Sequence, residues 1–328
     1  MGLRAAAVLA AGGGSRFDGP SHKLLAPLKG RPVWEWALAA MVHADFDVRI
    51  VVTGAVALDL PNHLIERHNP RWAQGQATSL LCAVAAADEA GADSLTVGLA
   101  DQPHVPGSAW RAVAQAPEKY QIVIATYNGK PGPHPVRLAR DIWPMLPASG
   151  DEGARRLIQS HPELVHRVPC WGSSADIDTA DDLDTLNRVT ELLGREPEGD
   201  FEVVVRDADG TPLVLRNAPL MHDGRPMPTL YWLVGRDALR DVSRLEAGGG
   251  VRAAEAEVDA DELAAAHFRY AAERDSRLPA DYDGPRPKGG VAGTRRGVKC
   301  LHAHYAYHLA GGDDPVGRWV AARLAEKC

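Results

Sequence analysis

Hydrophobic and polar positions divide the chain into two parts with different patterns. In the first part, short apolar runs bounded by Gly, Pro or Asp alternate with segments of helical spacing. The runs predict buried strands at residues 4–9, 48–52, 95–99, 122–127 and 164–168. The helical segments are residues 34–42, 76–89, 108–114, 152–160 and 180–193. This alternation predicts an α/β fold, a Rossmann-like and mainly parallel sheet with helices on both faces and ligand sites at the carboxyl ends of the strands.

The pattern changes after a Gly- and Pro-containing interruption at residues 194–199. Beyond it, strands at 201–206 and 212–216 flank Asp209-Gly210, a strong hairpin signal, and residues 229–234 can form a third strand. Helical patterns follow at residues 236–245, 259–273, 299–310 and 316–326. We therefore expect two domains, residues 1–195 and a smaller α+β domain at residues 200–328.

Composition narrows the class of protein. The chain is 45% hydrophobic and 24% charged, as in folded globular proteins, and its net charge of −7 argues against a dedicated nucleic-acid-binding protein. The four cysteines are scattered without a CxxC pair, and we find neither a secretory signal nor the ~20 consecutive apolar residues of a membrane helix. These features predict a cytoplasmic protein without a membrane segment. They do not predict its oligomeric state.

A glycine-rich loop follows the first strand and ends in a cation. Its residues are Leu9, Ala10, Ala11, Gly12, Gly13, Gly14, Ser15 and Arg16. Glycines let backbone N–H groups approach phosphate oxygens, and Arg16 together with Lys23, seven residues later, supplies positive charge. The loop lacks the Gly-Lys-Ser/Thr of a P-loop and the third spaced glycine of the dinucleotide fingerprint. It therefore predicts a phosphate-binding site of another kind.

Acidic residues occur at two further places in the first part of the chain. Asp101 directly follows a predicted strand, a position suited to Mg²⁺, which prefers oxygen ligands. Asp176 and Asp178 alternate and so share one face of an extended segment, which leaves either as a second ligand. Thr179 and Asp182 fit a capping box, so we assign Asp182 and its neighbour Asp181 to the start of the helix.

These motifs together resemble the molybdenum-cofactor nucleotidyltransferase family, in particular the cytidylyltransferase-like branch of its MobA-like NTP transferase domains. The resemblance rests on the loop, residues 69–80, 99–103, 134–136, 150–155 and 176–179, in the family's order. It implies Mg²⁺-dependent transfer of a nucleoside monophosphate to a small acceptor such as molybdopterin, with release of pyrophosphate. Leu-Ala-Ala-Gly at residues 9–12 is typical of the branch that uses CTP, whereas Leu-Ala-Gly-Gly is typical of the branch that uses GTP.

The resemblance also assigns roles. It implies catalytic roles for Arg16, Lys23 and Asp101, metal binding by Asp101 and Asp178, with Asp176 the alternative, and an acceptor side at His134 and Pro135. The residues implied in nucleotide binding are Leu9, Ala10, Ala11, Gly12, Gly13, Gly14, Ser15, Gly75 and Ser79. The stretch between Arg16 and Lys23 is longer than in the family, and we interpret His22 within it as a solvent-exposed loop histidine.

Other functions compatible with this fold are a non-catalytic nucleotide-binding scaffold, and a transferase that uses GTP or a sugar phosphate. The presence of Arg16, Lys23, Asp101 and Asp178 together favours an enzyme over a scaffold. The segments at residues 134–136 and 176–179 match the cofactor branch better than the sugar-phosphate branch.

The second part resembles a bacterial family known as domain of unknown function 501. The resemblance rests on residues 228–233, 244–246 and 297–305. His304 and His308 share a helical face, but Cys300 and His302 point elsewhere and no carboxylate lies at ligand spacing, so we expect a packed helix rather than a metal site. A basic stretch at residues 286–299 predicts an anionic ligand or a solvated surface. We expect this domain to fold independently.

Overall fold

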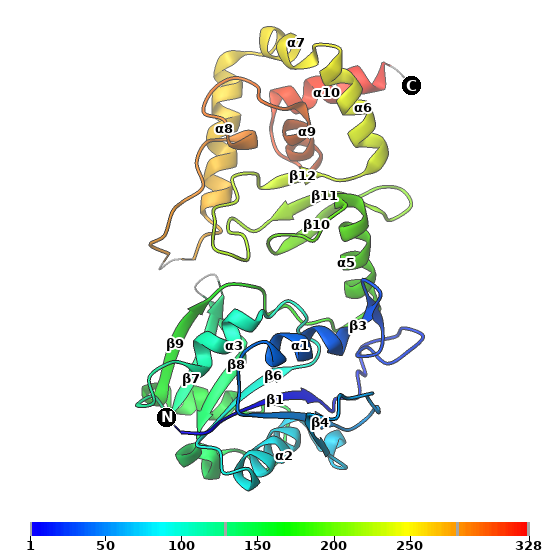
Figure 1. The fold of residues 1–328 in the computed structure, drawn as a ribbon. Coiled ribbons are helices and arrows are strands. Elements are labelled where there is room, and N and C mark those ends of the chain that lie inside the picture. The colour runs from blue at the N-terminus through cyan, green and yellow to red at the C-terminus, as the bar shows by residue number, and fades with distance from the viewer. Residues whose placement is uncertain (1, 128–129, 280–281, 327–328) are drawn as a thin grey trace. The chain divides into compact units, whose positions relative to one another are not determined.

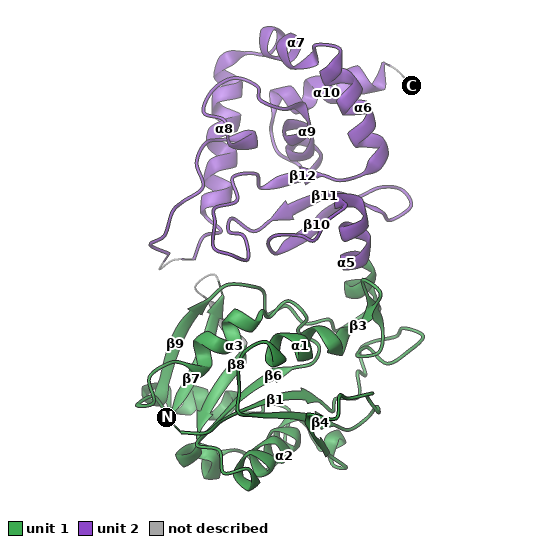
Figure 2. Ribbon diagram, viewed as in Figure 1, with its two compact units in different colours: residues 1–184 green, residues 185–328 purple. Residues whose placement is uncertain are grey.

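The computed structural model describes residues 2–127, 130–279 and 282–326 (Figure 1). They form two compact units, residues 1–184 and residues 185–328 (Figure 2). The division lies inside helix α5 (Ala180–Leu193), whereas the sequence placed the boundary after this helix. Both units contain helices and strands, but only the first has the large sheet that the loop and acidic motifs require.

The first unit is built on a seven-stranded sheet with the order β5-β4-β1-β6-β8-β7-β9. The strands are β1 (Arg4–Ala10), β4 (Val48–Thr53), β5 (Ile65–His68), β6 (Ser94–Leu99), β7 (Ile122–Tyr127), β8 (Lys130–Ala139) and β9 (Val165–Cys170). The strands β5, β4, β1 and β6 are parallel to one another, as are β7 and β9, and β8 lies between β6 and β7 and is antiparallel to both. The expected α/β class and mainly parallel sheet are confirmed. A small hairpin, β2 (Pro27–Leu28) and β3 (Arg31–Pro32), lies apart from this sheet.

Strand β8 was not predicted, because prolines at positions 131, 133 and 135 argue against a central strand. The pairing explains how the sheet accommodates them. Residues 136–139, which contain no proline, pair with β6 on one side, and three of them also pair with β7 on the other. The prolines lie outside the residues of β8 that pair with β6. Their missing N–H groups therefore remove no hydrogen bond to that strand.

Helices cover both faces of the sheet (Figure 1). They are α1 (Val33–Val42), α2 (Gln76–Glu89), α3 (Gly107–Ala114) and α4 (Arg155–Ser160), with 3₁₀ turns at Trp72–Gln74, Arg140–Met145 and Pro162–Leu164. Side chains alternate along β1, so Ala6 and Val8 join one apolar cluster with α1 and α3, whereas Ala7 and Leu9 join another with α2. Burial on both faces explains the nearly continuous apolar sequence of the strand.

The second unit pairs a three-stranded antiparallel sheet with helices. Its elements are β10 (Phe201–Arg206), β11 (Pro212–Asn217), β12 (Tyr231–Leu233), α6 (Arg236–Ala247), α7 (Gly250–Glu257), α8 (Ala260–Asp275), α9 (Leu301–Leu309) and α10 (Pro315–Ala325), with a 3₁₀ turn at Val291–Gly293. Helix α7 was not predicted, because the glycines before it indicate a helix stop. Val189 of α5 packs here against Leu215 and Val234. Among the helices described in both units, none has the length and apolar character needed to cross a membrane.

Candidate active site

The glycine-rich loop lines a cleft of about 540 Å³ beyond the carboxyl end of β1. All residues that the sequence assigned to catalysis, nucleotide binding or metal binding line this one cleft. They are Leu9, Ala10, Ala11, Gly12, Gly13, Gly14, Ser15, Arg16, Lys23, Gly75, Ser79, Asp101 and Asp178. Segments more than 160 residues apart in the chain therefore meet at the sheet edge where parallel α/β folds bind ligands.

Lys23 lies at the centre of the charged groups. Its Nζ is 2.5 Å from Asp101 Oδ2 and 3.4 Å from Asp178 Oδ1, and its side chain is only 12% exposed. The longer stretch after Arg16 thus still delivers the ammonium group to the acidic residues. Arg16 remains largely exposed, with Nη1 3.0 Å from Asp178 Oδ2.

Burial and charge act in opposite directions on Lys23. Burial alone would lower the pKa of the ammonium group, but attraction to Asp101, and then to Asp178, outweighs it and raises that pKa. Lys23 is therefore positively charged at neutral pH. Its charge compensates two carboxylates that would otherwise repel each other.

Backbone contacts bring Asp178 to this position. The N–H of Ile177 donates to the carbonyl of Asp101 at 2.9 Å, which fixes the acidic segment beside the end of β6. The predicted capping box is confirmed, since Asp182 N donates to Thr179 Oγ1 at 3.1 Å and Thr179 N donates to Asp182 Oδ2 at 2.8 Å. Asp182 Oδ2 also accepts from the N–H of Asp178 at 3.1 Å. The start of α5 and the position of Asp178 are therefore coupled.

Asp176 has different partners from Asp178. Its Oδ1 accepts a hydrogen bond from the buried Gln102 Nε2 at 2.6 Å. Loss of hydration, and then repulsion by Asp101, raise the pKa of Asp176 to about 6, although the residue as a whole remains exposed. Gln102 also donates a hydrogen bond to the carbonyl of Ser174, so it holds residues 174–176 in place. Of the two aspartates left open by the sequence, Asp178 is the one that lines the cleft.

Gly75 and Ser79 line the cleft from the start of α2. Gly75 has φ of +104°, and a Cβ there would lie 2.4 Å from the carbonyl carbon of Gly150, so a side chain is excluded on both grounds. The fully buried Asn69 donates to Thr78 Oγ1 at 2.9 Å and to Ser79 Oγ at 3.0 Å. Asn69 was recognised only as part of a motif, because its partners follow nine and ten residues later.

The interpretation of His22 as an exposed loop residue is wrong. His22 is partly buried, and its Nε2 lies 2.9 Å from the carbonyl oxygen of Gly12. Its Nδ1 accepts a hydrogen bond from the N–H of Leu24 at 3.2 Å. His22 therefore links the glycine-rich loop to the segment that carries Lys23, a contact that the local sequence could not reveal.

Comparison with known proteins identifies the family to which the first unit is related. Residues 6–165 match the model of the MobA-like NTP transferase domain. Purine catabolism protein PucB of Bacillus subtilis (strain 168) is 31% identical over 198 residues, which span 55% of this chain and 95% of that protein. The chain belongs to the MobA-like NTP transferase domain family. Nicotine blue oxidoreductase of Paenarthrobacter nicotinovorans is 28% identical over 201 residues, 57% of this chain and 94% of the relative.

The second unit and the solved structures complete the comparison. Residues 203–322 match the model of a protein of unknown function (DUF501), so the expected fusion is confirmed. A nucleotidyl transferase from Methanothermobacter is similar to the transferase domain, with 26% identity, a TM-score of 0.48 and coverage of 55% of this chain and 94% of that one. A manganese complex of Rv0371C from Mycobacterium tuberculosis H37Rv has 26% identity, a TM-score of 0.45 and coverage of 56% and 96%.

A second cavity of the transferase domain, about 750 Å³, contains the predicted acceptor-side histidine. It shares Leu9, Gln76 and Asp151 with the glycine-loop cleft, so the two cavities adjoin. His134 lines it, whereas the neighbouring Pro135 is buried and does not. Burial, and then the charge of Arg155, lower the pKa of His134 to about 3.

The four candidate ligands that the sequence offered, Cys300, His302, His304 and His308, do not form one group. His304 Nδ1 lies 2.7 Å from Asp314 Oδ2, with both side chains fully buried, and Asp314 also accepts from Gly317 N at the start of α10. His304 therefore belongs to the packed interior of its helix. Cys300 and His302 lie elsewhere on the same element, as the sequence indicated.

Proposed function

We propose that the transferase domain moves a nucleoside monophosphate from an NTP, preferably CTP, to a small acceptor such as molybdopterin and releases pyrophosphate. The observation that carries the proposal is the grouping of Lys23 with Asp101 and Asp178 beside the glycine-rich loop. A cation between two carboxylates at a loop of backbone N–H groups suits binding and neutralisation of phosphates.

The donor atoms around Lys23 fit a divalent metal. Asp101 and Asp178 offer carboxylate oxygens that both contact one Nζ, so they lie close enough together to share a cation. Mg²⁺ is commonly held by one or two carboxylates and the substrate's phosphates. When bound, Mg²⁺ would offset the negative charge that grows on the phosphoryl oxygens.

Groups of the protein itself account for the remaining steps. The glycine-rich loop holds the triphosphate while an acceptor oxygen attacks the α-phosphorus in line. The new O–P bond forms as the bond to the β-phosphate oxygen breaks, and the electron pair leaves with pyrophosphate. Arg16 and Lys23 stabilise charge on the leaving group, which is where it increases most in the transition state.

The acceptor is assigned to the second cavity. That cavity adjoins the glycine-loop cleft through Leu9, so an acceptor within it can reach the α-phosphorus. The Nδ1 atom of His134 is buried without a hydrogen-bond partner among the described residues, which leaves it available to an acceptor polar group.

The preference for CTP is assigned to Ala11. This residue is 1% exposed and lines the nucleotide cleft. An alanine at this position leaves less room beside the cleft than the glycine of the GTP-using branch would.

The test is pyrophosphate release by the full chain with CTP, GTP, ATP and UTP, each with Mg²⁺ and molybdopterin or a panel of small phosphorylated and hydroxylated acceptors. We expect turnover with CTP, and a loss of about 10²–10³-fold in kcat for Lys23→Met, since it removes one charge-stabilising donor. Asp101→Asn should abolish turnover. Lys119→Met is the matched control, because Lys119 is exposed and lies outside the cleft.

The outcomes separate the alternatives. Binding of CTP without pyrophosphate release from any acceptor would support a non-catalytic scaffold, and a preference for GTP would overturn only the base assignment. Normal turnover by Asp101→Asn would remove the metal assignment.

Because one relative is named an oxidoreductase, oxidation of NADH and NADPH should be followed in parallel, and we expect none above the protein-free rate.

A further inference from the structure

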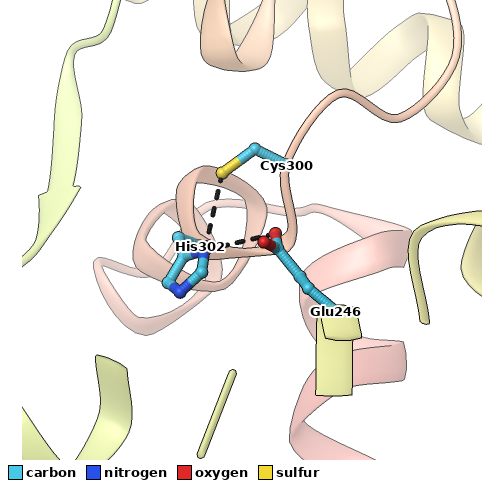
Figure 3. Close-up of side chains that lie close together, drawn as sticks. All are labelled: Glu246, Cys300 and His302. Carbon is cyan, nitrogen blue, oxygen red and sulfur yellow. Dashed lines mark hydrogen bonds and ion pairs between the residues drawn. The ribbon is translucent and has the colours of Figure 1, made fainter. Parts of the chain in front are cut away.

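Three side chains of types that commonly bind metals converge in the DUF501 unit, and none of them lines the transferase cleft. Glu246 lies near the end of α6, Cys300 is the N-cap of α9, and His302 is the second residue of that helix. Figure 3 shows the thiol and the carboxylate directed at the same edge of the imidazole ring. One donor atom from each residue lies within 4.8 Å of the others. Sequence analysis found no carboxylate at ligand spacing because Glu246 precedes Cys300 by more than 50 residues.

The distances fit a tetrahedral ion. Cys300 Sγ is 3.7 Å from His302 Nδ1, which in turn is 3.2 Å from Glu246 Oε1. Zinc bonds of ~2.3 Å to sulfur and ~2.0–2.1 Å to nitrogen and oxygen give tetrahedral edges of ~3.5 Å between sulfur and nitrogen and ~3.3 Å between nitrogen and oxygen. Two of the three donor pairs therefore match tetrahedral edges to within a few tenths of an ångström, and the third pair, Cys300 Sγ and a Glu246 carboxylate oxygen, lies within 4.8 Å.

The imidazole ring is already oriented for coordination. Its Nε2 atom is 3.0 Å from Ser243 Oγ and 3.4 Å from the carbonyl oxygen of Leu239. With the proton on Nε2, the ring donates to this outer pair and turns the lone pair of Nδ1 toward Cys300 and Glu246. Histidines that bind metals typically hold their second nitrogen in this way.

Glu246 is held in place as well. Its Oε1 accepts a hydrogen bond from the N–H of Leu301 at 2.5 Å, so the carboxylate also caps the start of α9. This bond uses one lone pair of a carboxylate that has about four acceptor positions. The remaining positions stay available to a cation.

We propose that Glu246, Cys300 and His302 form a site for a zinc-class divalent cation with an open fourth position. The mixed sulfur, nitrogen and oxygen donors favour Zn²⁺ over Mg²⁺ or Ca²⁺, which take oxygen ligands. Three protein ligands with partly exposed side chains, 27% for Glu246 and 21% for His302, leave room for water or a substrate atom. The fully buried core of the unit contains none of these residues, and Cys300 packs against it only as a partly buried side chain, so we assign the ion to binding or chemistry rather than to folding.

Cobalt(II) provides a direct test with the full-length protein. The reduced, EDTA-treated chain is titrated with Co²⁺ in excess Mg²⁺, and thiolate-to-cobalt charge-transfer absorption is recorded. We expect one equivalent to give this absorption together with tetrahedral d–d bands, and Zn²⁺ to displace the signal. The transferase cleft contributes oxygen ligands from Asp101 and Asp178, so it cannot produce a sulfur signal, and failure of either proposal is distinguishable from failure of the other.

Three variants define the site. Cys300→Ser should abolish the charge-transfer absorption, whereas Cys82→Ser, at a thiol outside the cluster, should keep it. Glu246→Gln retains an oxygen to accept from Leu301 N and should weaken Co²⁺ binding by about 10-fold or more. Unfolding midpoints establish that each variant is folded. Absence of the absorption in the unmodified chain, or its persistence in folded Cys300→Ser, would overturn the proposal.

Discussion

The ring of His134 makes the stability of the transferase domain sensitive to acid. Its pKa is lowered to about 3 by burial and by Arg155, whereas an unfolded histidine titrates near 6.5. The unfolded state therefore binds the additional proton first, and unfolding becomes easier as the pH falls below about 6.5. Between pH 7 and pH 5 this effect should cost up to about 2 kcal/mol of unfolding free energy.

The pH dependence can be assigned to this histidine by substitution. His134→Gln removes the titrating ring, so its unfolding free energy, measured by urea denaturation, should change less between pH 7 and pH 5 than that of the unmodified chain. His63→Gln is the control, since His63 is exposed. An unchanged pH slope in His134→Gln would show that another group is responsible.

Residue identities in the cleft could be predicted from the sequence because each belongs to a local motif. Asp101 directly follows a strand, where topology brings side chains to one edge of a parallel sheet, whereas the roles of Lys23 and Asp178 came from the family resemblance. His22 and Glu246 could not be predicted, because their contacts with Gly12 and Cys300 depend on how separate segments pack. A contact between side chains of separate segments leaves no local sequence pattern from which it could be predicted.

At the scale of elements, the start of α5 links helix stability to the site. Asp182 accepts hydrogen bonds from the N–H groups of Thr179 and Asp178, whereas the adjacent Asp181 is exposed and has no such bond in the described structure. Asp182→Ala should therefore lower the unfolding free energy by about 1 kcal/mol, and Asp181→Ala by much less. Thermal unfolding of the two variants measures the difference.

The same pair of variants tests the coupling to catalysis. Because Asp182 fixes the backbone of Asp178, Asp182→Ala should also reduce kcat for nucleotidyl transfer under conditions where both variants are fully folded. Equal rates in Asp181→Ala and Asp182→Ala would show that the cap stabilises the helix without positioning Asp178 for catalysis.

Most elements with a clear period were predicted. The missed elements include two that are interrupted by glycine or proline and the short edge strand β5. Helix α2 begins and ends at the predicted residues because its boundaries coincide with Gly75 and the end of its apolar spacing. Strand β8 and helix α7 were missed for the opposite reason, since prolines and glycines that normally end elements lie at their starts. The sheet tolerates the prolines only because they lie beyond the part paired with β6.

At the scale of the molecule, the second unit begins inside helix α5. Its C-terminal half forms an apolar cluster with the hairpin of that unit, in which Val189 is fully buried and Leu192 and Leu193 are partly buried. The interruption at residues 194–199 indicated a boundary in the sequence, but it follows a helix whose last two turns already belong to the second core. A fragment starting at residue 200 therefore lacks part of that core.

Two fragments make this difference measurable. The fragment 178–328 retains Val189 together with the cap at Thr179, whereas the fragment 200–328 exposes the faces of Leu215 and Val234 that Val189 covers. Burying one such side chain fully and two partly is worth about 3 kcal/mol, a large share of the ~5–15 kcal/mol that stabilises a typical domain. We expect 178–328 to unfold cooperatively in urea and 200–328 to be less stable by about that amount. Val189→Ala in the longer fragment should give an intermediate value, because it removes only one of the three contacts. Equal unfolding free energies for the two fragments would instead mean that α5 adds nothing to the second core, and that the unit begins where the glycines interrupt the sequence.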